Sequence, residues 1–150
     1  MTTVKISNQG APVSLEQIEQ FERRNGIVLP DSYKTFLLCN NGGEPMPDRL
    51  LVPGWYGQST AVNHFFGLGG DSSDDLETML PNVEDYVPKG YVPIVDDPGG
   101  NLFCLHTGNS QHGAIYFWDH EELHGDDPRN LRKVAGSIDE LLDKLLSSEK

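Results

Sequence analysis

Residues able to hold a metal ion gather most densely in Asp119-His120-Glu121-Glu122, with His124 close behind. Carboxylate and imidazole groups are common ligands of zinc and calcium. His120 and His124 would share a face only in a helix, whereas this stretch follows an apolar run typical of a strand and precedes Gly125. The pattern favours a solvated acidic loop, and we assign no metal ligand.

A cysteine, a histidine and an aspartate could form a thiol triad from Cys104, His106 and Asp119. Alternate residues of a strand share one face, so Cys104 and His106 would point the same way. No nucleophile turn and no oxyanion-hole pattern accompanies them in the sequence. We therefore predict no catalytic residue and do not expect an enzyme.

The glycine-rich stretch Gly67–Ser72 precedes a predicted helix, where a phosphate group often binds. It lacks the lysine of the Walker motif and has only part of the dinucleotide-binding glycine pattern. Asp71, Asp74 and Asp75 would repel a phosphate at that helix N-terminus. The sequence thus predicts neither a phosphate site nor a cofactor.

Negative charge is concentrated in the middle of the chain. The formal net charge is −12, and residues 35–128 hold 15 acidic and 2 basic side chains. Residues 1–34 carry four of each sign, and residues 129–150 carry four acidic and five basic side chains. Such a field repels nucleic acid and anionic membranes and attracts a basic partner. The alternative is a solvated surface that serves solubility alone.

The acidic residues next to the predicted turns and strand exit are the candidate partner-binding residues. They are Asp96, Asp97, Asp119, Glu121, Glu122, Asp126 and Asp127. Trp118, Tyr116 or Phe65 could supply apolar anchors inside an acidic rim, as in protein–protein interfaces. The alternative for these aromatic residues is a place in the core.

Length and composition set the broad class. A chain of 150 residues can bury roughly 70% of its unfolded surface, enough for one domain without metals or disulfides. The start, MTTVKISNQG, lacks the apolar segment of a signal peptide, and no apolar run approaches the ~20 residues that cross a bilayer. Cys39 and Cys104 lie among apolar neighbours, which predicts buried, reduced thiols. We expect a single domain over residues 1–150 in the cytoplasm.

Three apolar runs, Tyr91–Val95, Leu102–Leu105 and Ile115–Trp118, have strand length and strand composition. Stretches rich in proline, glycine and polar residues separate them and favour turns. We predict an antiparallel meander of strands at about 91–96, 101–106 and 114–119. The second and third runs do not alternate with polar residues, so both faces of these strands should be covered.

Helices are predicted on either side of this sheet. Ser14 and Gln17 fit a capping box that starts one helix, and Asn25-Gly26 ends it. A second helix runs from Pro30-Asp31 to Asn40–Gly43. A last one starts at Ser137, again with a capping box, and carries apolar residues at helical spacing.

The remaining stretches give weaker signals. Asp71–Leu80 reads as a short helix capped by Ser72 or Ser73 and ended by Pro81. Val62–Leu68 is predicted as a strand, and Leu50–Val52 as a short edge strand before Pro53. Residues 44–60 otherwise look irregular, and the sequence assigns them no role. The fold class is thus α+β, a mostly antiparallel sheet packed by an N-terminal helix pair and a C-terminal helix.

Two motifs in this order resemble the SUKH superfamily, the Smi/Knr domain named for yeast regulators of cell-wall glucan synthesis. Residues 29–37 with Asn41-Gly42-Gly43 are similar to its "L-P-x-x-Y-x-x-F-L … N-G-G" signature. Residues 92–120 are similar to its "I-P-I … D-x-G-G-N … G-x-V-Y-F-W-D-H-E" core. The resemblance runs from about Ser14 to Leu146 and departs from the family in the insert-like region 44–60.

The resemblance implies an α+β fold and a function. Bacterial members of the superfamily are immunity proteins that bind and neutralise polymorphic toxins, often nucleases. No catalytic set and no toxin-contacting residue can be carried over, and Gly99, Gly100, Trp118 and Asp119 match the pattern as residues that shape the fold. We expect an immunity protein that binds a basic toxin through its acidic surface. The alternative is a regulatory or scaffold protein of the cell-wall synthesis type.

Overall fold

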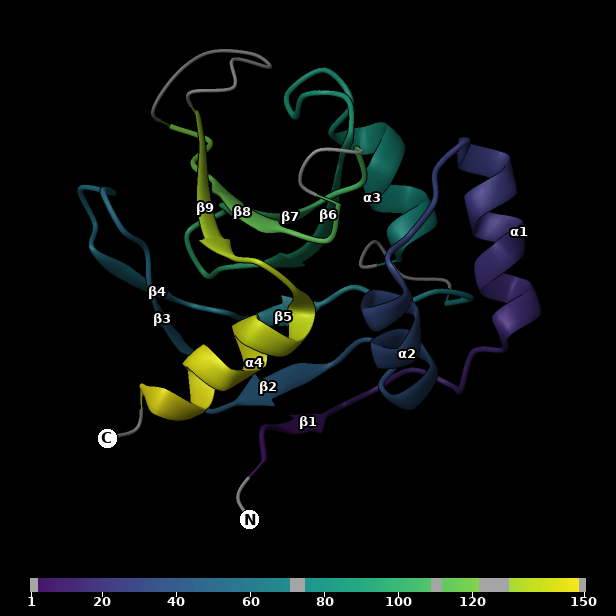
Figure 1. The fold of residues 1–150 in the computed structure, drawn as a ribbon, viewed down its shortest axis with the longest axis horizontal. Coiled ribbons are helices and arrows are strands. Elements are labelled where there is room, and N and C mark those ends of the chain that lie inside the picture. Colours follow the sequence, from purple (N-terminus) through teal and green to yellow (C-terminus); the bar gives the residue numbers. More distant parts are fainter. Residues whose placement is uncertain (1–2, 71–74, 109–111, 122–129, 149–150) are drawn as a thin grey trace.

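The computed structural model describes residues 3–70, 75–108, 112–121 and 130–148 (Figure 1). Within them the helices and strands follow the chain in the order given next. They are β1 (Lys5–Ser7), α1 (Leu15–Asn25), α2 (Asp31–Cys39), β2 (Glu44–Met46), β3 (Arg49–Leu51), β4 (Ser59–Ala61), β5 (His64–Phe65), α3 (Leu76–Asn82), β6 (Tyr91–Asp96), β7 (Leu102–His106), β8 (Ile115–Trp118), β9 (Leu131–Ala135) and α4 (Ile138–Ser147).

A five-stranded antiparallel sheet, in the order β5-β6-β7-β8-β9, forms the centre of the fold (Figure 1). Its middle three strands are the predicted meander, and Phe103 of β7 lies opposite Val95 of β6 and Phe117 of β8. This confirms the α+β class and the antiparallel pairing in sequence order. The sequence did not predict β9, and the strand expected over residues 62–68 is only the two residues of β5.

Two short ribbons flank the main sheet. β1 pairs with β2, and β3 pairs with β4, both antiparallel. The expected edge strand before Pro53 is β3, although it starts one residue earlier, at Arg49. The expectation that residues 44–60 are irregular is therefore wrong, because they contain β2, β3 and the first residues of β4. β2 pairs with the distant β1, and β3 pairs with β4 across a loop.

The helices predicted from Ser14 and from Ser137 are present as α1 and α4. Ser14 and Gln17 form the expected reciprocal capping box of α1, and Gly26 ends that helix with φ 64°. At α4 the Ser137 side chain accepts from the Glu140 backbone N–H, while the Glu140 carboxylate accepts from Gly136 instead of Ser137. The second capping box is thus only half formed.

Gly42 and Gly43, which the sequence places at the end of the second helix, both have positive φ, at 81° and 117°. They do not close α2, however, because Asn40, in an extended conformation, donates the last helical hydrogen bond to Phe36. A Cβ on Gly43 would lie 2.5 Å from the Ser7 carbonyl oxygen. The glycine is therefore required because β1 passes close to its backbone.

Helix α3 starts later than expected. It begins at Leu76, with Asp75 as its N-cap, and includes Pro81 instead of ending before it. The Asp75 carboxylate accepts from the Glu77 and Gly70 backbone N–H groups, a cap that replaces the serines named from the sequence. Those serines, with residues 71–74, lie outside the described residues.

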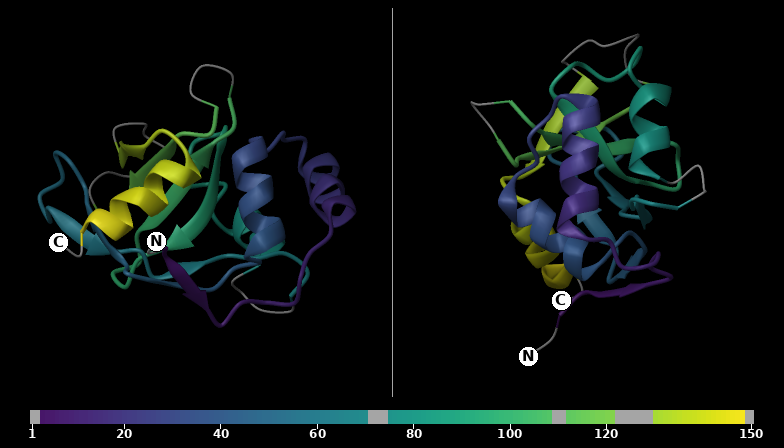
Figure 2. Two further views of the ribbon diagram at one scale, coloured as in Figure 1. Left: turned by 60° about the horizontal axis from the view of Figure 1, so that its bottom comes forward. Right: turned by 90° about the vertical axis from the view of Figure 1, so that its right-hand side faces the viewer.

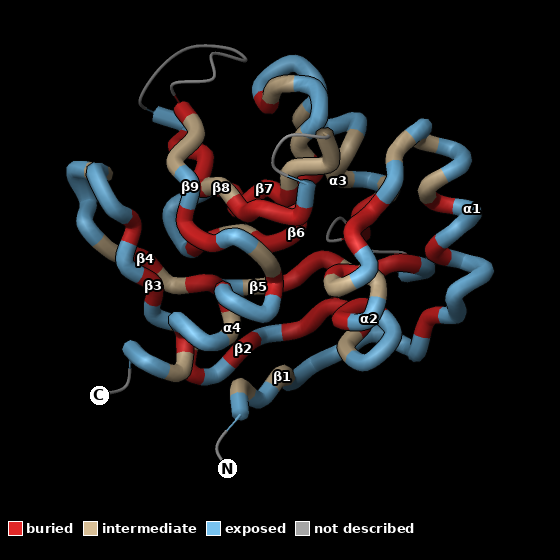
Figure 3. The backbone as a smooth tube through the Cα atoms, viewed as in Figure 1, coloured by how far each residue is buried: buried red, intermediate tan, exposed pale blue. Residues whose placement is uncertain are grey.

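Buried residues follow β6, β7 and β8 (Figure 3). Phe103 and Phe117 are fully buried, as predicted, and their rings lie 5.2 Å apart. Helices α4, α2 and α1 lie side by side in that order (Figure 2), and α3 packs against β6. In β7 all four residues of Leu102–Leu105 are buried, so both faces of that strand are covered. No helix within the described residues is long and apolar enough to span a membrane.

Candidate functional site

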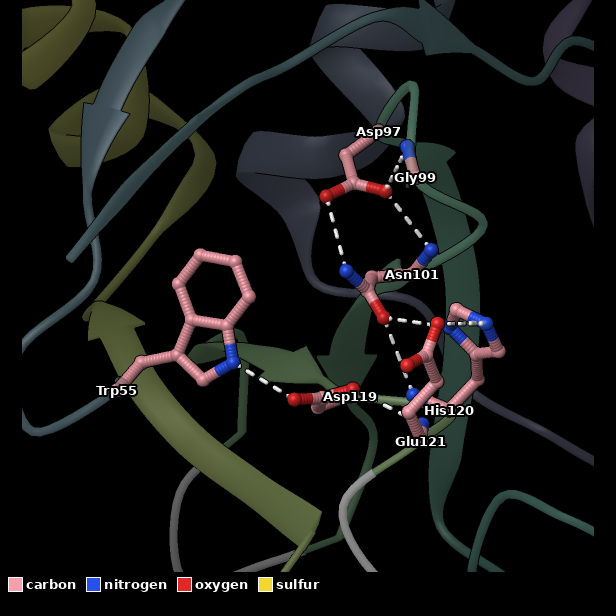
Figure 4. Close-up of polar contacts among 7 residues, drawn as sticks. All are labelled: Trp55, Asp97, Gly99, Asn101, Asp119, His120 and Glu121. Carbon is pink, nitrogen blue, oxygen red and sulfur yellow. Dashed lines mark hydrogen bonds and ion pairs between the residues drawn. The ribbon is translucent and has the colours of Figure 1, made fainter. Parts of the chain in front are cut away.

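The candidate acidic residues that the structure describes meet at one end of the main sheet, where β6 and β8 end. Figure 4 shows three of them, Asp97, Asp119 and Glu121. Asp96 ends β6, Asp97 starts the turn to β7, and Asp119 and Glu121 follow β8. The other three candidates, Glu122, Asp126 and Asp127, lie outside the described residues.

Asp97 holds the β6–β7 turn together and is only 4% exposed. Its Oδ1 accepts from the Gly99 N–H at 3.0 Å and from the Asn101 N–H at 2.8 Å. Its Oδ2 accepts from the Thr60 hydroxyl at 2.7 Å and from the Asn101 side-chain amide at 3.1 Å. Four donors compensate the burial of this carboxylate, as burial of a charge requires.

Asp119 likewise holds the backbone at the exit of β8 and is 1% exposed. Its Oδ2 accepts from the Trp55 indole N–H at 2.7 Å, and its Oδ1 accepts from the Glu121 N–H at 2.9 Å. The carboxylate therefore joins the β3–β4 hairpin to the end of β8 (Figure 4).

Asn101 links the β6–β7 turn to the exit of β8. Its amide group donates to Asp97, while its Oδ1 accepts from the His120 backbone N–H at 3.1 Å and lies 2.7 Å from the His120 Nδ1. Because Oδ1 can only accept, Nδ1 carries the proton in this arrangement. The other ring nitrogen, Nε2, lies 3.3 Å from the Glu121 carboxylate. Turn and strand exit are thus held as one unit.

Among the four described candidates, Glu121 is the most exposed. The Glu121 side chain is 70% exposed, and Asp96 is half-buried with one oxygen 3.4 Å from the Asn63 amide nitrogen. Asp97 and Asp119 face inward, and their hydrogen bonds position the backbone that presents Asp96 and Glu121. The sequence motif "D-x-G-G-N" could have indicated the inward-facing Asp97, since an aspartate before glycines commonly accepts hydrogen bonds from the backbone of the turn that it starts.

The alternative thiol triad is not assembled. Cys104 is fully buried, and burial raises the pKa of its thiol far above the ordinary value. The His106 Nδ1 accepts from the Gly108 N–H at 3.1 Å, and Asp119 is bonded to Trp55. Of the two expected buried thiols, Cys39 is instead exposed, and both are free. Residues 3–70, 75–108, 112–121 and 130–148 contain no cluster of three or more side chains suited to a metal.

The aromatic residues named as possible anchors are divided. Trp118 and Phe65 belong to the core, and Tyr116 is half-buried with its ring edge-on to Tyr91. In the β3–β4 hairpin, half-buried Trp55 packs on Phe117, and Tyr56 next to it is 70% exposed. No local sequence pattern indicates that Trp55 packs on Phe117, because this contact joins residues far apart in the chain.

Comparison with known proteins places these features in a family. The sequence model described as SMI1 / KNR4 family (SUKH-1) matches residues 12–144. A protein of Bacillus subtilis (strain 168), the SPbeta prophage-derived uncharacterized protein YokK, is 29% identical over 147 residues, covering 87% of this chain and 73% of that protein. F-box only protein 3 of Homo sapiens and of Bos taurus is 28% identical over 101 residues. That match covers 67% of this chain and only 18% of the F-box protein.

Proposed function

The chain belongs to the SMI1 / KNR4 family (SUKH-1), and on that premise we propose that it is an immunity protein that binds and blocks a protein toxin. The family includes immunity proteins, and such a protein needs a binding surface and no catalytic group. We propose further that the toxin is basic, as a nuclease domain would be.

The observation that supports a basic partner is the position of the negative charge. Residues 35–128 carry 15 acidic and 2 basic side chains, while the rest of the chain is nearly balanced. In the described part of this stretch, three acidic residues (Asp75, Asp97 and Asp119) are buried. The others reach the surface: Glu44, Asp48, Glu77, Glu84, Asp85, Asp96 and Glu121. Solubility alone gives no reason to gather the charge in this part of the chain.

Electrostatics supplies the mechanism. A surface of one sign raises the rate of encounter with a partner of the opposite sign, and the effect weakens as salt screens the charges. Carboxylates in the place of phosphates also occupy the basic groups with which a nuclease holds its substrate. In this proposal Asp96, Glu121, Glu122, Asp126 and Asp127 make the outward contacts. Asp97 and Asp119 keep the turn and strand exit rigid behind them.

Co-expression with the toxin domain encoded nearest its gene tests this function. We expect growth of the host to be restored and a complex to be purified with the toxin. Growth arrest with no complex would contradict the proposal and favour a regulatory or scaffold protein of the cell-wall synthesis type. A catalytically inactive toxin variant separates binding from toxicity in the purification.

A further inference from the structure

A groove of about 860 Å³ lies where the end of α1, helix α3 and the segment leading into β6 meet. Its floor is apolar and consists of Ile27, Leu80, Val83, Val87, Tyr91 and Val92. Val87 and Val92 are buried, whereas the other four are partly open to the groove. The groove lies where β6 begins, at the opposite end of that strand from Asp96.

Polar contacts hold the two helices that wall the groove. The Arg24 guanidinium of α1 forms an ion pair with the Glu77 carboxylate of α3. The Asn25 side chain donates to the Phe21 carbonyl at 2.9 Å and to the other Glu77 oxygen at 3.3 Å. Helices α1 and α3 lie side by side in Figures 1 and 2. The groove is therefore formed before any ligand arrives, which lowers the entropic cost of binding.

The rim of the groove carries carboxylates that are not neutralised. Glu84 and Asp85 are exposed, and their side chains make no hydrogen bond or ion pair with another described residue. Both oxygens of Glu77 are already engaged by α1. Lys89 is the opposing charge on the same segment. Next to Asp85 in the chain, Tyr86 is 53% exposed.

The lining of the groove indicates which kind of ligand it binds. A small-molecule site usually places several polar groups inside the cavity to orient the ligand. Here the inner polar groups are satisfied, since Asn25 is bonded to Glu77 and the Thr107 hydroxyl donates to the Gly90 carbonyl at 3.1 Å. An apolar floor with free carboxylates at the rim instead suits a protein segment with an apolar side chain beside a lysine or arginine.

We propose that this groove anchors the toxin by receiving an apolar side chain of the toxin, whose neighbouring lysine or arginine pairs with Glu84 and Asp85. The inference rests on the proposed function, but it adds a second contact away from the acidic turns at the other end of β6. The turns steer the encounter, while the groove slows dissociation because its floor is desolvated on binding.

Dissociation constants with the inactive toxin domain test the groove. The variant Glu84→Gln/Asp85→Asn should raise Kd roughly five- to tenfold, and Lys89→Gln should lower it, because removing the competing cation favours a basic segment. The variant Glu19→Gln/Asp143→Asn removes the same charge from exposed positions outside the groove and should change Kd less than about twofold. All these side chains are exposed, so the unfolding midpoints should match the wild type.

The outcomes of these binding measurements distinguish the groove proposal from the proposed immunity function on which it rests. A wild-type complex with the predicted order of Kd values supports the groove as the anchor. A wild-type complex whose Kd responds alike to the groove variant and to its control overturns the groove and leaves the immunity function standing. Failure of the wild type to bind the toxin overturns both.

Discussion

The indole N–H of Trp55 donates a hydrogen bond of 2.7 Å to the buried Oδ2 of Asp119, across 64 positions of the chain. The same indole ring packs edge-on against Phe117, with ring centroids 4.7 Å apart. One residue of the β3–β4 hairpin therefore fixes the exit of β8, and through Asp119 it fixes the backbone of Glu121.

Removing this donor should destabilise the protein. Trp55→Phe keeps an aromatic ring but leaves a buried carboxylate oxygen without its partner, at a cost of about 1–3 kcal/mol of unfolding free energy. Urea denaturation measures it. Asp119→Asn and the double variant complete a cycle, and a coupling energy near zero would show that the two residues do not depend on each other.

The close passage of β1 over Gly43 predicts a large cost for a methyl group there. Gly43→Ala meets both a positive φ and the Ser7 carbonyl at 2.5 Å, so it should cost well above ~1 kcal/mol. Gly90 has φ 92° and open space around its Cβ position, so Gly90→Ala reports the backbone strain alone, about 1 kcal/mol. Equal losses in the two variants would contradict the steric explanation.

Phe103 lies at the centre of the core, so its truncation should be costly. Phe103→Ala leaves a cavity between Val95 and Phe117 and should lower the unfolding free energy by roughly 3–5 kcal/mol. Thermal or chemical denaturation measures the change. Tyr86→Ala, at an exposed position, serves as the control with little effect, and a similarly small effect at Phe103 would contradict the assigned core.

The two thiols should differ in reactivity. Cys39 is exposed, so a thiol reagent should modify it in the folded protein, whereas buried Cys104 should react only on unfolding. Burial raises the Cys104 pKa, so the folded state holds that proton more tightly than the unfolded chain. Stability is therefore expected to fall as pH rises above the ordinary thiol value of 9.0. Replacing Cys104 by alanine should remove that pH-dependent part, and rapid modification of two thiols at neutral pH would contradict the burial.

The features that the sequence predicted are those with local causes. The capping serines, the helix-ending Gly26 and the uninterrupted apolar runs specify α1, α4 and the meander through neighbouring residues. Strand β9 was missed because Arg132 and Lys133 interrupt its apolar pattern, and only its pairing with β8 makes it a strand. Strands β1 and β2 likewise depend on partners far away, such as Ser7 opposite Glu44.

In the candidate site, too, the features that depend on distant residues could not be predicted from the sequence. Composition locates the acidic stretch, but the type of residue cannot distinguish the exposed Glu121 from the buried Asp119. The buried carboxylates of Asp119 and Asp97 are bonded by Trp55 and Thr60, which lie 64 and 37 positions earlier in the chain. The groove had no sequence signal, because its walls come from residues 24–27 and residues 77–92.

Association kinetics with the cognate toxin test the central claim most directly. Asp96, Glu121, Glu122, Asp126 and Asp127 are converted to Asn or Gln, and Asp97 and Asp119 are left intact because they hold the fold. A variant with Glu16, Glu19, Asp31, Asp139 and Asp143 neutralised loses the same charge outside residues 35–128. We expect the first variant to lower the on-rate roughly tenfold or more and the second to lower it less, and the wild-type on-rate to fall steeply with salt. An on-rate indifferent to salt and to both variants would contradict the central claim.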